Sequence, residues 1–381
     1  MSQLPNKLRE KLKTRKSYNA LRCLKDTTNL IDFSSNDYLG FSTSKVIFDK
    51  AAAILKEYRL ENNGATGSRL LSGNHKLFNI TEATIAAFHN VEDALIFTSG
   101  YDANIGFFSC IPQRGDIIFY DELCHASIRD GIQLSLAKSY KYKHDDVANF
   151  LALTERIQSH DGEIYVITES VFSMDGDTPD LMTMAKICEE KDYHLVVDEA
   201  HAIGVFGVNG IGKIQELGLE ALVFARIVTF GKALGCHGAA ILGSTELKQY
   251  LVNFARSFMY TTGLPPHSVA TIWAAYTHLS RDEDARNSLN RNTGILRLYI
   301  KKHKLENKFI PSESAVYCCV IPGNDRVKSV SEKLMENGFD VKPILSPTVP
   351  FGKERLRLCI HSYNTEEEIK IFIELMATFV K

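Results

Sequence analysis

Residues 195–204 read LVVDEAHAIG, a short apolar run that ends in Asp198 and Glu199. Such a run predicts a buried strand, and a carboxylate at its end needs a partner because burying an isolated charge is costly. Two acidic residues after a buried strand are also how nucleotide-hydrolysing enzymes hold magnesium, and the letters DEAH occur in ATP-driven helicases. The rest of the chain distinguishes these uses.

A nucleotide site would need a phosphate-binding loop before the DEAH sequence. The near match is GVNGIGKI at 207–214, which follows it and ends in Ile214, where a magnesium-binding Ser or Thr is required. The formal net charge of −2 gives no general attraction to a polyanion. The sequence therefore disfavours a helicase and nucleic-acid binding.

A metal site is the second interpretation, because His194, Asp198, Glu199 and His201 are clustered. On a strand, however, Asp198 and Glu199 point to opposite faces. No cysteine or third histidine at ligand spacing completes a set. We expect no metal here.

Strand and helix signals alternate along most of the chain. The helical segments include KLFNITEATIAAFHN, ASIRDGIQLSLAK and LMTMAKICEEKDY. The short apolar runs between such segments are ALIF (94–97), DIIFY (116–120), EIYVIT (163–168), HLVVD (194–198) and ARIVTF (225–230). This alternation predicts an α/β fold with a mainly parallel sheet covered on both faces.

The rhythm changes after about residue 285, where the pattern indicates a smaller α+β domain. We predict an N-terminal helix and strand segment at 1–45, a large domain at 46–285 and a small C-terminal domain at 286–381.

Composition is that of an ordinary globular enzyme, with 381 residues, 45% hydrophobic and 24% charged. The eight cysteines form no CxxC pair, which is typical of reduced thiols in a cytosolic protein, and Cys318 and Cys319 are expected in the core. No apolar stretch is long enough for a membrane span. The basic N-terminus could form a membrane-binding or targeting helix, but Glu10 and Asp26 favour a surface helix. We expect a soluble cytoplasmic protein.

Lys232 suggests a function for Asp198. It stands in IVTFGKALGCHGAAIL (227–242), directly after an apolar strand and among small uncharged residues. A desolvated lysine becomes an amine nucleophile that can form a Schiff base with an aldehyde cofactor. Pyridoxal phosphate carries such an aldehyde, and its ring nitrogen needs an acid partner. Asp198 is the candidate partner.

Other needs of this cofactor find candidates in the sequence. Its phosphate suits the strand-to-helix turn TSGYDAN (98–104), where backbone N–H groups are available. A flat partner for the ring is His125, just after a predicted strand. Donors for the ring oxygen are His201 and Ser173.

The motifs together resemble the α-oxoamine synthases among the fold-type I pyridoxal-phosphate enzymes. The resemblance covers nearly the whole chain. It rests on FSSNDYLGF (33–41), GATGSRLLSGNH (64–75), SGYDAN, the HAS at 125, ESVFSMDGD, DEAHAIGVFG, TFGKALGCHGAA, SPTVP and RLRL. It implies a large domain with a mainly parallel seven-stranded sheet and a small C-terminal domain.

The resemblance also implies residue roles. Lys232 would carry the Schiff base, Asp198 would pair with the pyridinium and His125 would stack on the ring, all three taking part in catalysis. The remaining cofactor contacts would be Ser173 and His201 at the ring oxygen, and Gly100, Tyr101 and Thr229 at the phosphate. Family members are homodimers, so Thr261 and Thr262 could reach the neighbour's phosphate. Substrate contacts would be Arg22, Asn36, His125 and Thr348.

The implied reaction is a decarboxylative condensation of a small amino acid with an acyl thioester, which makes the chain an acyltransferase. The expected pair is L-alanine and a pimeloyl group on coenzyme A or acyl carrier protein, giving 8-amino-7-oxononanoate for biotin, CO2 and free thiol. The sequence leaves the acyl chain and its carrier open.

One position departs from the family pattern. Leu345 stands where an arginine usually pairs with the carboxylate of the amino acid, so Lys342, Arg355 or Arg357 would have to replace it, or the substrate is held differently. A serine palmitoyltransferase-like or autoinducer synthase-like enzyme therefore stays an alternative. More distant alternatives are a fold-type I aminotransferase and a catalytically inactive protein on this fold.

Overall fold

The structure is a computed structural model that describes residues 4–22, 24, 29–157 and 161–380. Cys23 and Asp26, which entered the sequence analysis, lie outside the described residues. The chain divides into two compact units, which are described separately. The smaller unit comprises residues 1–35, 174–176 and 289–381, and the larger comprises 36–173 and 177–288.

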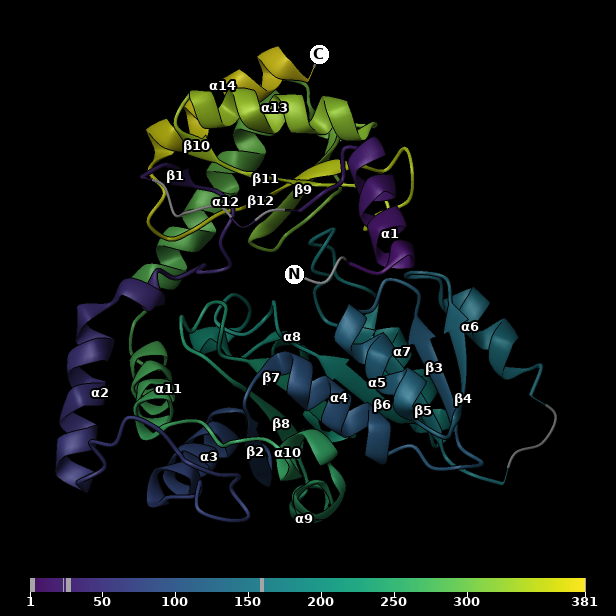
Figure 1. The fold of residues 1–381 in the computed structure, drawn as a ribbon, viewed down its shortest axis with the longest axis vertical. Coiled ribbons are helices and arrows are strands. Elements are labelled where there is room, and N and C mark those ends of the chain that lie inside the picture. Colours follow the sequence, from purple (N-terminus) through teal and green to yellow (C-terminus); the bar gives the residue numbers. More distant parts are fainter. Residues whose placement is uncertain (1–3, 23, 25–28, 158–160, 381) are drawn as a thin grey trace. The chain divides into compact units, whose positions relative to one another are not determined.

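The larger unit is built on a seven-stranded sheet (Figure 1). The strands are β2 (Asp93–Phe97), β3 (Ile117–Asp121), β4 (Lys138–Tyr142), β5 (Ile164–Glu169), β6 (His194–Asp198), β7 (Ala225–Thr229) and β8 (Ala239–Gly243). Their order is β2-β8-β7-β6-β5-β3-β4, and β8 alone among them runs antiparallel to its neighbours. The five strands predicted from apolar runs are confirmed to within one residue at each end, as is the mainly parallel α/β sheet.

Helices cover both faces of this sheet. One face packs against α4 (Gly100–Cys110), α5 (Ala126–Leu134), α9 (Thr245–Phe254) and α10 (Arg256–Met259). The other packs against α6 (Val147–Thr154), α7 (Leu181–Glu190) and α8 (Lys213–Glu216). Alternate residues of β6 serve the two cores, since Val196 belongs to the first and its neighbours Leu195 and Val197 to the second. A strand buried on both faces must be apolar throughout, which is why LVV predicted it.

The larger unit also contains helices that pack beside the sheet. Helix α11 (Pro266–Leu279) lies against both α2 (Lys45–Tyr58) and α3 (Lys76–Phe88). Three short 3-10 turns complete this unit, namely η1 (Phe41–Thr43), η2 (Val208–Gly210) and η3 (Glu220–Leu222).

The smaller unit holds two small sheets. In the antiparallel sheet, β12 (Arg355–Cys359) lies between β11 (Lys342–Ile344) and β9 (Val316–Val320), whereas β1 (Ile31–Asp32) pairs in parallel with β10 (Phe339–Asp340). The remaining elements are α1 (Asn6–Ser17), α13 (Asn324–Glu336), α14 (Glu366–Phe379) and η4 (Glu306–Lys308). The long helix α12 (Asp284–Lys302) begins in the larger unit and ends in this one.

The seven described cysteines form no disulfide with one another. Cys318 and Cys319 are fully buried in β9, which confirms their expected place in the core. Within the described ranges, no helix is both long and apolar enough to cross a membrane.

Candidate active site

Three neighbouring parallel strands bring polar residues to one edge of the large sheet. Glu169 ends β5, Asp198 ends β6 and Thr229 ends β7, and Lys232 follows three residues after Thr229. The carboxyl ends of strands are where ligand sites of open α/β sheets lie. Lys232 is half-buried in the turn after β7, and its carbonyl accepts a hydrogen bond from the N–H of Gly235 at 2.8 Å.

Asp198 is a buried carboxylate that is held by neutral groups. Its side chain accepts hydrogen bonds from Nδ2 of Asn104 at 3.0 Å and from the backbone N–H of Ala200 at 2.9 Å, and the residue is 6% exposed. Asp198 also interacts electrostatically with His125. Burying a carboxylate is costly without a cationic partner, so the site suits a ligand that brings a positively charged N–H.

Glu169 is a site residue that the sequence analysis missed. It lies beside Asp198 in the sheet register, is 2% exposed and accepts a hydrogen bond from the backbone N–H of His125 at 2.6 Å. Burial, followed by the charge of Asp198, raises the pKa of Glu169 to about 8, although Lys232 opposes this shift. Its position directly after the predicted strand EIYVIT (163–168), next to a strand that ends in Asp198, is the signal that could have found it.

His125 is joined to Asp198 by a chain of hydrogen bonds. It caps the N-terminus of α5, and its Nδ1 lies 2.7 Å from Oγ of Ser127. That hydroxyl accepts from Nδ2 of Asn104 at 2.9 Å, and the same amide nitrogen donates to Asp198. Burial lowers the pKa of His125, and the charge of Asp198 opposes this shift. The network fixes the imidazole orientation relative to the carboxylate.

The NDYLG segment supplies a second buried network. The hydroxyl of Tyr38 lies 2.7 Å from Nδ1 of His201 and donates to Oδ1 of Asn36 at 3.1 Å. Tyr38 is fully buried and His201 is 4% exposed. Two predicted site residues, Asn36 and His201, are thus linked by a tyrosine to which the sequence analysis gave no role. Ser173, the other predicted ring-oxygen contact, lies half-buried in the loop after β5.

The predicted phosphate turn does adjoin the end of β7. Ser99 caps α4 by accepting a hydrogen bond from the N–H of Asp102 at 3.0 Å. A Cβ atom on Gly100 would lie 3.6 Å from Cβ and Oγ1 of Thr229, so these two predicted residues are neighbours. Tyr101 is 48% exposed, and its hydroxyl donates to Asp130 at 2.5 Å. The N-terminus of α4 offers backbone N–H groups that suit a phosphate.

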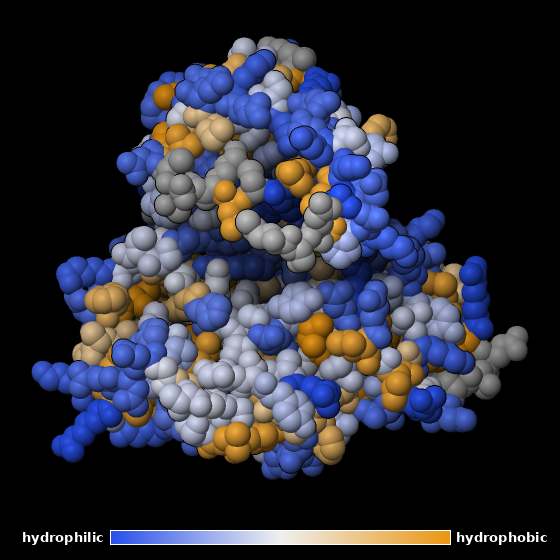
Figure 2. Space-filling model, in the orientation of Figure 1, coloured by the Kyte–Doolittle hydropathy of each residue, from blue (hydrophilic) through white to orange (hydrophobic). Residues whose placement is uncertain are grey.

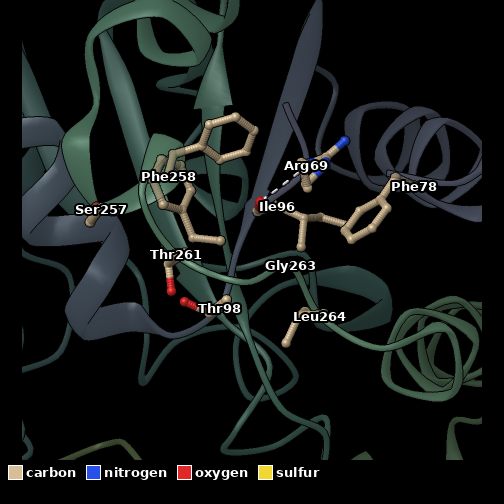
Figure 3. A pocket seen from close by; sticks show the side chains of 10 residues that line it. Arg69, Phe78, Ile96, Thr98, Ser257, Phe258, Thr261, Gly263 and Leu264 are labelled. Carbon is tan, nitrogen blue, oxygen red and sulfur yellow. Dashed lines mark hydrogen bonds between the residues drawn. The ribbon is translucent and has the colours of Figure 1, made fainter. Parts of the chain in front are cut away.

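A small pocket lies beside this turn (Figure 3). Figure 3 shows the side-chain oxygens of Thr98 and Thr261 lying close to one another in it. Arg69 also lines the pocket, forms an ion pair with Glu82 at 2.5 Å and stacks on the ring of Phe78. Thr261 therefore lies near the phosphate turn of its own chain, whereas the neighbouring Thr262 is exposed.

The predicted substrate residues Arg22 and Thr348 belong to the smaller unit and contact each other. Nη2 of Arg22 donates to Oγ1 of Thr348 at 3.0 Å, and both residues are exposed. Leu345 is half-buried, and its carbonyl accepts from the N–H of Thr348 at 2.8 Å. This bond holds the turn that displays the threonine.

The three possible replacements for the missing arginine differ in their surroundings. Arg355 is 6% exposed and forms a buried ion pair with Asp175, and burial lowers its pKa. Lys342 is more exposed and pairs with Asp340. Arg357 donates to Sγ of Cys359 at 3.2 Å. Arg355 is the least suited of the three, because binding a substrate would strip Asp175 of its buried partner.

Glu199 has a structural role on the opposite face of the sheet. It is fully buried, accepts from the backbone N–H groups of Lys213 at 2.7 Å and Ile214 at 3.0 Å, and pairs with Arg226 at 3.5 Å. The predicted divergence of Asp198 and Glu199 is therefore confirmed. Because two amides of the GVNGIGKI loop are bonded to this carboxylate, the geometry of that loop gives no support to a phosphate site.

His144 is another residue that the sequence analysis missed. It bridges Asp121, at 2.9 Å, and Asp177, at 2.7 Å, and thereby ties the end of β3 to the loop that contains Ser173. Burial opposes its charge, but hydrogen bonds to the two carboxylates outweigh burial and raise the pKa of His144 to about 10. We infer that His144 is protonated and that its positive charge anchors the loop that contains Ser173.

Comparisons with known proteins agree with this arrangement. Residues 28–375 match the family described as aminotransferase class I and II. The 8-amino-7-oxononanoate synthase of Emericella nidulans is 38% identical over 399 residues, which cover 99% of this chain and 96% of that protein.

Two solved structures are also similar. The 8-amino-7-oxononanoate synthase of Francisella tularensis is 30% identical, with a TM-score of 0.77 and coverage of 92% of this chain and 97% of that one. A serine palmitoyltransferase from S. paucimobilis, solved with a bound PLP–myriocin aldimine, has a TM-score of 0.89 over 98% of this chain and 96% of its own. At 22% identity, the latter supports the fold alone.

The fold, together with a lysine and an aspartate at adjacent strand ends, defines a fold-type I pyridoxal-phosphate enzyme. Within that class, the chain belongs to the α-oxoamine synthase family of acyltransferases.

Proposed function

We propose that this enzyme condenses L-alanine with a pimeloyl thioester and releases CO2, free thiol and 8-amino-7-oxononanoate, a step of biotin biosynthesis. The names of the relatives from Emericella nidulans and Francisella tularensis support this substrate pair. The observation that carries the proposal is the buried Asp198 at the carboxyl end of β6, held by Asn104 and Ala200 one strand away from the half-buried Lys232.

The residues at the sheet edge fit pyridoxal phosphate. Asp198 offers a buried anion to a ring N–H, and Lys232 offers an amine to an aldehyde. Gly100 and Thr229 stand together at the N-terminus of α4, where a phosphate is favoured. Oδ1 of Asn104, next to Asp198, is buried and has no hydrogen-bond partner in the described part of the chain. One buried acceptor of this site is therefore left unsatisfied by the protein itself.

When bound, the cofactor supplies an electron-poor ring that disperses negative charge from the α-carbon of the amino acid. The protein's contribution is to hold the groups around it. Asp198 would keep the ring nitrogen protonated, and Asn104 and Ala200 fix its carboxylate by two hydrogen bonds. His125 would cover one ring face, held by Ser127 and by the bond from its N–H to Glu169.

Proton transfer at the α-carbon is the task we assign to Lys232. Its amine would take the Cα proton of alanine and return a proton after decarboxylation. The buried network of His201, Tyr38 and Asn36 would hold a donor at the ring oxygen, with Ser173 as the second donor.

Substrate binding is assigned to the residues that the resemblance named. Arg22 and Thr348, which contact each other, would bind the acyl substrate, and Asn36 would lie on the amino-acid side. Since Leu345 cannot pair with a carboxylate, we propose that Lys342 or Arg357 takes that role, in preference to Arg355 with its buried partner. Because Leu345 departs from the family pattern, a serine palmitoyltransferase-like choice of substrates is the second candidate.

We further propose a cytoplasmic homodimer. The absence of disulfides among the seven described cysteines supports a reducing compartment. The exposed residues Leu71 and Tyr260, at 85% and 71%, support an interface on the face that carries Thr262.

The decisive experiment mixes the purified protein with alanine, serine or glycine and with acyl thioesters of different chain length. Thiol and CO2 release are measured for each pair. We expect alanine with pimeloyl thioester to be the fastest pair. A higher kcat/KM for serine with a long acyl chain would replace the proposed function by the second candidate, and no thiol release from any pair would refute both.

A further inference from the structure

The first turn of α5 buries a hydroxyl group inside the larger unit. Figure 2 shows hydrophilic and hydrophobic side chains interspersed on the surface of this unit. Within the fold, Ser127 is fully buried, and its Oγ lies 2.7 Å from Nδ1 of His125. The same oxygen accepts a hydrogen bond from Nδ2 of Asn104 at 2.9 Å. The hydroxyl must also place its own proton, because a buried donor without an acceptor is costly.

The carboxylate of Asp198 sets the direction of these hydrogen bonds. Nδ2 of Asn104 donates one hydrogen to Oδ2 of Asp198 at 3.0 Å and the other to Oγ of Ser127. A reversed amide would place its oxygen against the carboxylate, and neither oxygen could donate. Among the described residues, Nδ1 of His125 is therefore the acceptor that remains for the proton of Ser127.

A second donor reaches the same ring nitrogen. His125 is the N-cap residue of α5, and its Nδ1 accepts a hydrogen bond from the backbone N–H of Ser127 at 3.3 Å. A backbone N–H group can only donate. Because both contacts require Nδ1 to be an acceptor, the imidazole is neutral and its single proton lies on Nε2.

The other ring nitrogen is left for a bound molecule. His125 is exposed, and no residue in the described part of the chain forms a hydrogen bond with its Nε2. An N–H group at this position can donate a hydrogen bond but cannot remove a proton. This division of tasks agrees with the assignment of the Cα proton transfer to Lys232.

We propose that Ser127 is a positioning residue that holds His125 in the tautomer with the proton on Nε2, so that the ring offers a hydrogen-bond donor to a substrate oxygen. The tautomer is a property of the folded chain alone. The donor role rests on the proposed function, because that function supplies the carboxylate and the thioester carbonyl. Asp198 orients the donors through Asn104, in addition to its proposed pairing with the cofactor ring.

Charged groups near the imidazole determine how the effect of Ser127 can be detected. Burial lowers the pKa of His125, and the charge of Asp198 opposes this shift. Donors to Nδ1 also stabilise the neutral ring. Loss of the hydroxyl should therefore raise the pKa of His125 while every surrounding charge stays in place. The titratable groups around this residue are Asp198, Lys232, Arg129, Asp130 and Glu169, which binds its backbone N–H.

The test is nitrogen NMR of the full-length protein with isotope-labelled histidine, before and after addition of pyridoxal phosphate. The signals of His125 are those that disappear in His125→Gln. In wild type, Nδ1 should resonate as a nitrogen without hydrogen and Nε2 as a nitrogen that carries one. In Ser127→Ala, the two signals should move towards each other and the pKa of His125 should rise. A hydrogen on Nδ1 in the wild-type protein would overturn the proposal, and so would unchanged signals in Ser127→Ala.

Two further variants separate the hydroxyl from its packing. Ser127→Thr keeps the hydroxyl and should keep the wild-type signals. Ser135→Ala removes a hydroxyl at the other end of α5, where it bonds to Pro112 and Ala137, and should alter neither the signals nor the pKa of His125. Urea unfolding verifies that each variant is folded. Equal changes in Ser127→Ala and Ser135→Ala would refute the assigned role, as would a folded Ser127→Thr that behaves like Ser127→Ala.

Kinetics test the donor role separately from the tautomer. At neutral pH, Ser127→Ala should lower kcat/KM about tenfold, because a hydrogen bond to a substrate oxygen is weakened. Relative to wild type, this loss should shrink as the pH falls through the pKa of His125, since an imidazolium carries hydrogen on both nitrogens. A loss that is the same at every pH would refute the donor role.

The two measurements also separate this inference from the proposed function. The expected NMR signals in a protein that releases no thiol from any thioester would support the tautomer and refute the proposed reaction. Thiol release by a protein whose Nδ1 carries the hydrogen would leave the proposed reaction standing and refute the role of Ser127.

Discussion

Asp198 and Glu199 are neighbours in the chain, but their carboxylates serve opposite faces of the large sheet. Asp198 contacts Asn104 of α4, whereas Glu199 binds the backbone of Lys213 and Ile214 at the start of α8. One carboxylate lies at the candidate cofactor site and the other closes a loop. The acidic pair therefore does not act as one metal-binding unit, and substituting each residue should have different consequences.

Asp198→Asn should leave the fold intact and lower kcat by at least about a hundredfold, because a neutral amide cannot keep a ring nitrogen protonated. Glu199→Gln should instead destabilise the fold. It leaves Arg226 buried without a counter-charge and should cost roughly 3 kcal/mol of unfolding free energy, with kcat of the folded enzyme unchanged. Urea unfolding and steady-state kinetics of both variants check this contrast. Equal kcat losses in the two variants would contradict it.

Lys232→Ala should abolish the visible absorption that borohydride reduction removes, and should lower thiol release by at least about a thousandfold. The reason is that the amine of Lys232 is proposed both to attach the cofactor and to transfer the Cα proton. Lys213→Ala is the control, since Lys213 is a half-buried lysine on the other side of the sheet, paired with Glu216 at 2.9 Å. Thiol release near the wild-type rate from Lys232→Ala would remove this residue from the mechanism.

The large sheet shows which elements a sequence can predict. Apolar runs found β2, β3, β5, β6 and β7 because these strands are buried on both faces. The pattern missed β4, KSYKY, since an edge strand exposes four of its five residues and carries no apolar period. It also left AAILG unassigned, which forms the antiparallel strand β8.

The candidate site divides in a similar way. Lys232 and Asp198 could be named because each follows an apolar strand. The Asn104–Ser127 link and the Tyr38–His201 contact could not, because they join residues far apart in the chain. Such contacts depend on how helices and loops return to the sheet edge, which residue spacing does not encode.

Glu169→Gln should change how stability depends on pH. The folded pKa of about 8 lies above the ordinary value of 4.5, so the carboxyl group's stabilising contribution is fully present below about pH 4.5 and is lost as the pH rises through about 8. A glutamine cannot ionise and avoids that loss. Relative to wild type, Glu169→Gln should therefore gain unfolding free energy between pH 5 and 9.

Urea unfolding of the protein across this range measures the effect. Glu163→Gln, at an exposed position that pairs with His194, is the control and should follow the wild-type curve. A constant difference between wild type and Glu169→Gln over the whole range would show that Glu169 does not titrate there.

His144→Gln removes the positive charge that holds the loop containing Ser173. The folded pKa of about 10 exceeds the ordinary 6.5, so the stability that the imidazolium contributes is fully present below about pH 6.5 and is lost as the pH rises through about 10. Wild type should lose unfolding free energy more steeply than His144→Gln between pH 7 and 10. The variant should also be less stable at pH 7, because Asp121 is left buried without its cation.

Unfolding titrations of wild type, His144→Gln and the surface control His194→Gln separate the cause. The control should keep the wild-type slope, since its partner Glu163 is 62% exposed and already solvated. If His144→Gln and His194→Gln behaved alike, the bridge between Asp121 and Asp177 would have no special contribution. His144 holds the loop that contains Ser173, whereas His194 contacts only the exposed Glu163 as an ion-pair partner. A higher KM for the amino acid in His144→Gln alone would therefore show that this loop positions a residue at the site.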